Sequence, residues 1–205
     1  MIARDGIVYI LPPVGLAVLF FWLGLWPVGI AFVLIAAFMA FFFRDPKRES
    51  PTDANVIVSP ADGRVTRISA LEEANENSPT LVSIFLSPLN VHINRSPIAG
   101  EITSVAYIRG KFLPATDARA SVINEQNVLT IKGETVTVVC KQIAGILARR
   151  IVCWKRAGDR VTLGERIGLI KFSSRTDLIL PSNVEVLVSV GARVRGGTTI
   201  IGRIR

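Results

Sequence analysis

The sequence predicts a mainly β protein: a compact β-sandwich or barrel-like domain with lipoyl-like repeats, preceded by an N-terminal apolar helical hairpin. Three observations lead to this fold class. Residues 6–43 contain no charged side chain. The rest of the chain consists of short runs rich in Val, Ile and Thr, which recur about every ten residues and are separated by Gly, Pro, Asn and Asp. Finally, a glycine and valine pattern occurs twice near the C-terminus.

Residues 1–45 are expected to form a membrane-associated hairpin with helices at about 7–25 and 28–43. A membrane span needs about 20 apolar residues, and the uncharged run is too long for one helix of that size. Gly and Pro within GLWPVG, residues 24–29, predict a turn near its middle. Trp22 and Trp26 flank this turn, as is typical of residues at a membrane interface. Pro12 and Pro13 predict a kink or a late start in the first helix.

Positive charges flank the apolar run and predict its orientation. Arg4 precedes the run, whereas Arg44, Lys47 and Arg48 follow it. Because such charges tend to stay in the cytoplasm, we expect both ends of the hairpin, and the domain that follows, on the cytoplasmic face of the cell membrane. A cleaved signal peptide would have an apolar region of only about 7–15 residues. The pattern leaves open whether the hairpin spans the membrane or is re-entrant.

Residues 46–205 are expected to form the β-rich domain. Only one stretch, 116–124, has a helical pattern. The predicted strands are 56–58, 64–68, 80–86, 101–107, 127–131, 135–143, 151–154, 166–172, 177–180, 184–190 and 198–204.

The internal repeat reads GxxVxxGxxIG at 158–168 and GxxVxxGxxIIG at 191–202. Turn glycines between short strands explain this spacing, which is also typical of lipoyl- and biotinyl-carrier-like β-folds. Such carriers need a lysine in the turn for modification, and neither copy has one. The repeat therefore predicts a fold and not a carrier function.

Composition narrows the function classes. Lys plus Arg number 24 and Asp plus Glu 16, for a net charge of +8, which favours a phosphate-bearing partner such as nucleic acid or anionic lipid. Aromatic residues lie largely in the apolar hairpin, so few remain to stack on bases, and no nucleic-acid partner is expected. A single histidine, His92, and two distant cysteines, Cys140 and Cys153, exclude a zinc finger and a multi-histidine metal site. No metal is predicted.

Three segments contain residues suited to catalysis, although each also has a structural explanation. In SPADGRV, residues 59–65, Asp-Gly is a typical hairpin turn, but Asp62 is also a rigidly held carboxylate that could orient an imidazole. Around His92, Asn90 and Asn94 alternate with apolar residues, so one strand face is polar and includes the histidine, as suits proton transfer. SSRTD, residues 173–177, reads as a hairpin loop between two apolar strands and lacks the GxSxG of a hydrolase.

Taken in this order, the segments resemble the short bacterial and archaeal form of phosphatidylserine decarboxylase. The matching stretches are FRDP after the apolar run, SPADGRV, FLSPLNVHINRSPIAG, GKFL, NEQN, IGLIKFSSRTDLILP and VxVGxxVxxGxTxIG. They cover nearly the whole chain, and their order is far more specific than any one of them.

The resemblance implies a proenzyme that cuts its own backbone between Ser173 and Ser174. The products would be a β chain, 1–173, and an α chain, 174–205, which remain together as a heterodimer. Ser174 would become a pyruvoyl group, the cofactor of the reaction. His92 would act as the base and Asp62 would orient it.

The implied reaction converts phosphatidylserine in the membrane to phosphatidylethanolamine and CO2. The pyruvoyl group would form a Schiff base with the headgroup amine and act as an electron sink, and His92 would reprotonate the α-carbon. Two of the basic residues that could bind the lipid phosphate, Arg95 and Arg175, lie within the matching segments. All six candidates are Arg64, Arg95, Arg109, Arg149, Arg150 and Arg175.

The sequence departs from the family pattern at two positions. Ser173 stands where the family usually has Gly, which predicts slower processing because a Cβ restricts a tight turn. Arg95 stands where longer members have a second histidine, so His92 would serve both processing and decarboxylation. Two alternatives remain open: an archaetidylserine decarboxylase acting on ether lipids, and a non-enzymatic, membrane-tethered β-module.

Overall fold

A computed structural model describes the chain except for residues 72–77, 118, 147–149 and 172–173. The chain divides into two compact units, Met1–Lys47 and Arg48–Arg205. Each unit is described by itself.

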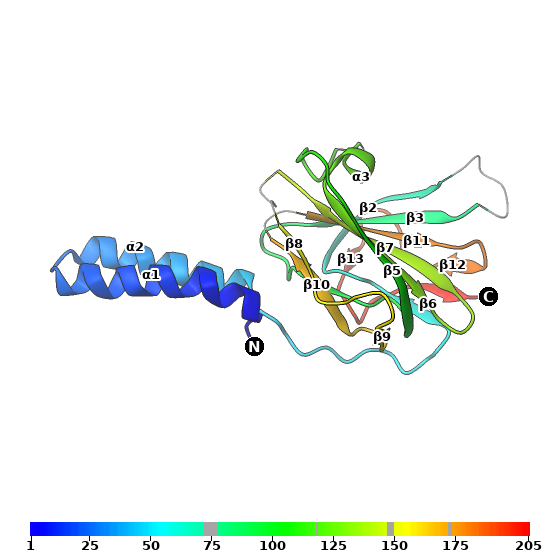
Figure 1. The fold of residues 1–205 in the computed structure, drawn as a ribbon, viewed down its shortest axis with the longest axis horizontal. Coiled ribbons are helices and arrows are strands. Elements are labelled where there is room, and N and C mark those ends of the chain that lie inside the picture. Colours follow the sequence, from blue (N-terminus) through cyan, green and yellow to red (C-terminus); the bar gives the residue numbers. More distant parts are fainter. Residues whose placement is uncertain (72–77, 118, 147–149, 172–173) are drawn as a thin grey trace. The chain divides into compact units, whose positions relative to one another are not determined.

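The first unit is a helical hairpin, as the sequence predicts. Helix α1 spans Arg4–Trp22 and helix α2 spans Trp26–Phe42, and the two lie side by side (Figure 1). Phe20 and Phe32 stack across the hairpin with ring centroids 5.5 Å apart. The 19-residue α1 is long and apolar enough to cross a membrane, whereas α2 has 17 residues. This is weak support for membrane association.

The late start that Pro12 and Pro13 suggested for the first helix is wrong. Helix α1 begins at Arg4 and runs through both prolines. A proline removes one backbone hydrogen bond to the residue four positions earlier, yet α1 continues through both prolines and packs against α2. Pro13 and Ala17, one turn apart, are both buried.

The second unit is the predicted β-rich domain. Its strands form one eight-stranded and two three-stranded sheets, and its one described helix is the short α3. The elements are β1 (Val56–Val58), β2 (Gly63–Ala70), β3 (Thr80–Leu86), β4 (Ile93–Arg95), β5 (Gly100–Ile108), α3 (Ala120–Ile123), β6 (Gln126–Lys132), β7 (Thr137–Ala144), β8 (Ile151–Cys153), β9 (Arg160–Val161), β10 (Arg166–Ile170), β11 (Ser174–Leu180), β12 (Val184–Val186), β13 (Arg193–Val194) and β14 (Ile200–Ile204).

The large sheet curls around the main hydrophobic core (Figure 1). Its order is β13-β2-β3-β11-β7-β6-β5-β9, and its strand pairs are antiparallel. The smaller sheets are β1-β14-β12 and β4-β10-β8. Strand β11 therefore lies in the middle of the large sheet, with β3 on one side and β7 on the other.

The internal repeat is visible in the backbone. Gly158 and Gly191 have φ of 91° and 93°, and Gly164 and Gly197 have 73° and 76°, values that favour glycine. The strand that follows the first glycine of each copy, β9 or β13, pairs at one of the two edges of the large sheet. The turns that contain the second glycine of each copy, Gly164 and Gly197, lie against each other. A Cβ built on Gly197 would be only 3.4 Å from the Cα of Gly164.

The sequence misjudged the segment after β10. Strand β11 begins at Ser174 and not at Asp177, and β10 belongs to a different sheet, so SSRTD does not join two strands of one hairpin. Arg175, Thr176 and Asp177 are polar but fully or almost fully buried, with hydrogen-bond partners. Strands β9 and β13 were not predicted. Strand β4 begins at Ile93, one residue after the histidine that was expected on a strand face, and the helix is limited to Ala120–Ile123.

Candidate active site

Ser174 is the first residue of β11 and is fully buried. It pairs with Leu86 at the end of β3 and with Ala144 at the end of β7. Its Oγ has no hydrogen-bond partner among the described residues. A buried hydroxyl usually has a partner, so this oxygen is a candidate reactive group.

The two faces of β11 have different roles, because successive side chains alternate across a strand. Ser174 and Thr176 share the face on which Leu178 and Leu180 join the core. Arg175 and Asp177 occupy the opposite face and form a buried ion pair of 2.6 Å between Nε and Oδ1. Ser83 accepts a hydrogen bond from Arg175 at 2.7 Å, and Ser121 donates one to Asp177 at 2.8 Å.

A chain of buried amides crosses the core side of β11. Asn127 donates to Gln142, and Gln142 donates to Asn94, both at 2.9 Å. Asn94 in turn donates to the Thr176 hydroxyl at 2.9 Å. The close approach needs glycine at position 168, since a Cβ there would lie 2.9 Å from Gln142 Nε2. The amide chain therefore joins β4, the strand just after His92, to the strand that begins with Ser174.

His92 is almost completely buried. It lies two residues before Asn94, the member of the amide chain that binds Thr176. Its carbonyl accepts a hydrogen bond from Ile170, four residues before Ser174. Its Nδ1 is 3.0 Å from the carbonyl oxygen of Asn90. Because a carbonyl only accepts, Nδ1 carries the proton in the neutral ring, and Nε2 is the basic nitrogen.

In the contacts that the structure describes, Asp62 binds Arg48 and Gly196 and not His92. Its Oδ2 forms a 2.8 Å ion pair with Arg48, and its Oδ1 accepts a 2.7 Å hydrogen bond from the backbone of Gly196. The group bonded to Nδ1 of His92 is the Asn90 carbonyl. Asp62 therefore anchors its own turn to the second repeat.

The three sequence segments nevertheless converge. The carbonyl of Pro60, in the SPADGRV turn, accepts a 2.9 Å hydrogen bond from the backbone of Arg95. The turn thus lies against β4, and β4 lies against β11 through Asn94 and Thr176. Residues from widely separated parts of the sequence meet at the Ser174 end of β11.

Both arginines singled out in the sequence are buried and hydrogen-bonded. Arg95 donates from Nη1 to the carbonyl of Gly164 at 2.9 Å, at the point where the two repeats meet. Arg175 is held by Asp177 on the face opposite Ser174. Ser173, the predicted residue before the cleavage point, lies outside the described residues, as does Arg149.

Sequence reasoning did not connect the residues of the amide chain with one another. Asn94 was noticed because it alternates with apolar residues beside His92, and Asn127 lies in the NEQN segment. Gln142, in the middle of an apolar strand, was not noticed. A polar residue within such a strand was the available signal, since a buried amide needs a partner.

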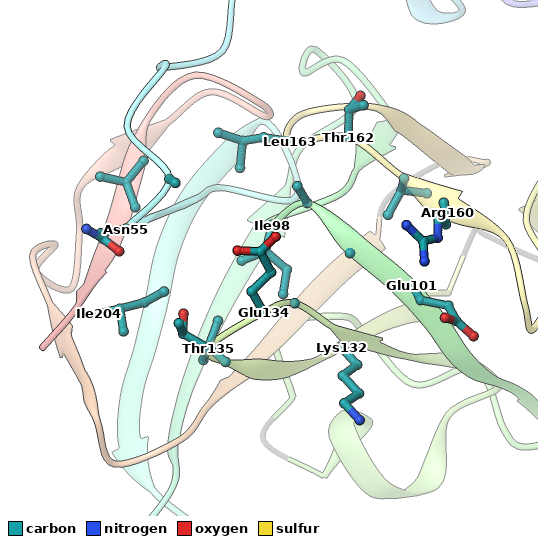
Figure 2. Close-up of a pocket in the computed structure, with 17 residues that line it drawn as sticks. Asn55, Ile98, Glu101, Lys132, Glu134, Thr135, Arg160, Thr162, Leu163 and Ile204 are labelled. Carbon is teal, nitrogen blue, oxygen red and sulfur yellow. The ribbon is translucent and has the colours of Figure 1, made fainter.

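A pocket of about 750 Å³ lies at the other end of the domain (Figure 2). It is lined in part by Lys132, at the end of β6, and by Glu134 and Thr135 from the turn between β6 and β7. Residue Ala144, beside Ser174, is at the opposite end of β7. The pocket is thus separate from the candidate active site.

Known proteins resemble this chain over most of its length. The family model for phosphatidylserine decarboxylase matches residues 35–202. A protein of Solibacter usitatus named phosphatidylserine decarboxylase proenzyme is 47% identical over 98% of this chain and 96% of its own length. A protein of Symbiobacterium thermophilum with the same name is 46% identical over 100% of this chain and 96% of its own length.

Proposed function

The chain belongs to the phosphatidylserine decarboxylase family, and we propose that it acts through a pyruvoyl group made from its own Ser174. It is a lyase of phospholipid biosynthesis that removes CO2 from phosphatidylserine and leaves phosphatidylethanolamine. The observation that supports Ser174 as the source of the pyruvoyl group is its buried Oγ, which has no described hydrogen-bond partner. A bulky lipid substrate and the proenzyme name of the relatives are both consistent with an active site that forms only after the backbone is cut.

The proposed self-cleavage begins at Ser174. Its Oγ attacks the carbonyl carbon of residue 173, the C–N bond of that peptide breaks, and an ester replaces it. Loss of the α-proton then breaks the Cβ–O bond, which releases residue 173 as a carboxylate and leaves dehydroalanine at position 174. Addition of water to dehydroalanine releases ammonia and yields the pyruvoyl group.

His92 is the proposed base for these proton transfers. A serine hydroxyl is a weak nucleophile until a base takes its proton, and His92 is the only imidazole in the chain. The hydrogen bond from Nδ1 to the Asn90 carbonyl holds the ring in the tautomer with a basic Nε2. The same nitrogen, once protonated, would return a proton to the α-carbon after CO2 leaves.

A pyruvoyl carbonyl supplies the electron sink that decarboxylation of an amino acid headgroup requires. The residues around Ser174 suit such a group. Leu86 and Ala144 flank it without adding charge, and the position is closed to solvent.

The two chains would stay together after the cut. Strand β11 begins at the cleavage point and keeps its pairing with β3 and β7. Strand β14, also in the α chain, pairs with β1 of the β chain. Beside the new N-terminus, Arg175 donates to Ser83 and Ser121 donates to Asp177, and both hydrogen bonds join the α chain to the β chain. We therefore propose a non-covalent heterodimer of residues 1–173 and 174–205.

The hairpin would hold this heterodimer at the membrane that contains its substrate. Helix α1 has the length and composition of a membrane span. Basic residues on both sides of the apolar run support placement of the catalytic domain on the cytoplasmic face.

Mass spectrometry of the purified protein tests the proposal. The parent chain should give two chains and an α chain that reacts with a carbonyl reagent, in place of the intact 22.3 kDa chain. Ser174→Ala should remain a single unreactive chain, because alanine has no oxygen for the acyl shift. Ser173→Ala, the matched control one residue away, should still be cut. Loss of cleavage in Ser173→Ala with normal cleavage in Ser174→Ala would move the site by one residue.

A further inference from the structure

We propose that the catalytic domain itself docks on an anionic lipid bilayer through the rim around Ser174. This Ser174 rim consists of the exposed apolar residues Leu89, Ile108, Val122 and Ile146 and the basic residues Arg109, Lys111, Arg119 and Arg150. The inference rests on the proposed function, because it concerns how the substrate bilayer meets the site that contains Ser174. It is separate from the hairpin, which belongs to the other unit of the chain.

Backbone pairing places three of the apolar residues at this end of the large sheet. Leu89 lies in the turn that follows β3, whose last residue, Leu86, pairs with Ser174. Ile146 follows closely after Ala144, the other partner of Ser174. Ile108 ends β5, at the edge of the same end of the sheet.

Val122 reaches the rim on α3, a short helix that two hydrogen bonds tie to the large sheet. The amide of Asn124, just after this helix, donates to the carbonyl of Ala144 at 2.7 Å. Ser121, just before Val122, donates to Asp177 on β11. Val122 is nevertheless 80% exposed. Helix α3 therefore presents an apolar side chain to solvent while it is tied to the strand of the reactive serine.

The basic residues come from the same segments of the chain as these apolar side chains. Lys111 pairs with Asn124 beside α3, and Arg109 follows directly after β5. Arg150 is exposed, and its carbonyl accepts a hydrogen bond from Lys171, close to Ser174 in sequence. Among the described residues, no carboxylate lies within ion-pair distance of these three cations.

The two carboxylates at the rim have partners that limit their repulsion of lipid. The Arg119 hydrogen bonds lower the pKa of Asp117 to about 2, so this carboxylate stays ionised and paired. Glu125 interacts with the Tyr107 hydroxyl and raises its pKa. Net positive charge therefore remains on Arg109, Lys111 and Arg150.

A surface that combines apolar side chains with cations suits the boundary between lipid headgroups and acyl chains. The cations attract anionic lipid, and the apolar side chains enter the layer below. Each basic residue near an anionic surface contributes about a fivefold preference for the docked state. Docking in this way would bring the serine headgroup to the end of β11 that begins with Ser174.

The test uses the full-length chain reconstituted in vesicles and a fluorophore sensitive to polarity. Cysteine is introduced as Val122→Cys, or as Thr135→Cys at the opposite end of β7, in a Cys153→Ser background. The remaining Cys140 is fully buried, which raises the pKa of its thiol to about 12 and protects it from labelling. The vesicles are phosphatidylcholine alone or phosphatidylcholine with phosphatidylglycerol.

The label at position 122 should shift to shorter wavelength and gain intensity in the anionic vesicles, and added salt should reverse part of the change. The label at position 135 should respond equally in both vesicles. Lys111→Gln should lower the ratio of docked to undocked protein about fivefold. Lys132→Gln, an exposed lysine at the other end of β6, is its matched control and should have no effect.

Equal emission from position 122 in both kinds of vesicle would overturn the proposal. An emission shift that depends on the amount of protein per vesicle, and not on the phosphatidylglycerol content, would also overturn it. A second copy of the chain would then cover the surface. Decarboxylation by the unlabelled parent is measured separately, in vesicles that also contain phosphatidylserine. A parent that shows no decarboxylation contradicts the proposed function, whereas an active parent without the emission shift contradicts only the docking surface.

Discussion

The side-chain amide of Asn94 donates a 2.9 Å hydrogen bond to the hydroxyl of Thr176. This bond connects two strands that lie in different sheets, β4 and β11. Each residue is two positions after a proposed catalytic residue, His92 or Ser174. The relative position of the base and the nucleophile therefore depends on a hydrogen bond between two residues that take no part in the chemistry.

Replacement of Asn94 tests this dependence. Asn94→Leu should slow self-cleavage and reduce the free energy of unfolding by about 1–3 kcal/mol, because it leaves the buried Gln142 amide without its acceptor. Stability is measured by urea unfolding in a Ser174→Ala background, where the chain stays intact. The control is Ser104→Ala, which removes an exposed 3.1 Å hydrogen bond to Thr130 and should cost less than about 0.5 kcal/mol. Equal effects of the two variants would show that the amide chain has no special role.

His92→Ala should slow self-cleavage by about 100-fold or more, the usual contribution of a positioned base. A time course of chain cleavage after synthesis measures the rate. Added imidazole should restore part of it, which a purely structural loss would not allow. Cleavage of His92→Ala at the parental rate would remove His92 from the mechanism.

Asp62 should affect cleavage through the position of its turn. Asp62→Ala removes both the ion pair with Arg48 and the hydrogen bond from Gly196, so it should greatly slow cleavage. Asp62→Asn keeps an oxygen for the Gly196 backbone and should slow it less. If Asp62 acts instead by orienting His92 through its carboxylate, the two variants should be equally slow, because neither keeps that carboxylate.

Ser173→Gly should speed cleavage. Glycine removes the Cβ that restricts a tight turn, and the loss of chain rigidity costs only about 0.5–1 kcal/mol. The rate of cleavage is compared between the parent and the variant at one pH. An equal or slower rate in the glycine variant would mean that serine at this position carries no penalty.

The two cysteines should differ in reactivity. Burial raises the pKa of the Cys140 thiol from 9.0 to about 12, whereas Cys153 is partly exposed. A thiol reagent at pH 8 should therefore modify one cysteine in the native protein and two after unfolding. Since the neutral thiol favours the folded state, its stabilising effect is complete below pH 9 and declines as the pH rises toward 12. Rapid modification of both native thiols would contradict the packing of β7 in the core.

The sequence by itself determined the hairpin, the β-rich class and the family. Runs of apolar residues and the spacing of Gly and Pro are local properties, which explains why α1, α2 and strands such as β1 and β3 were predicted within a few residues. The order of the three motif segments carried the family resemblance, because order does not depend on contacts.

Only the tertiary structure decided where the polar side chains of these segments point. Arg175 and Asp177 look like loop residues because they are charged, yet each neutralises the other within a buried strand. Gln142 looks like an isolated polar residue, yet it lies between Asn127 of the neighbouring strand β6 and Asn94 of the remote strand β4. Asp62 likewise binds the backbone of Gly196, far away in the sequence. Burial of a polar group is favourable only when a partner is present, and such partners arise from the packing of strands far apart in the chain.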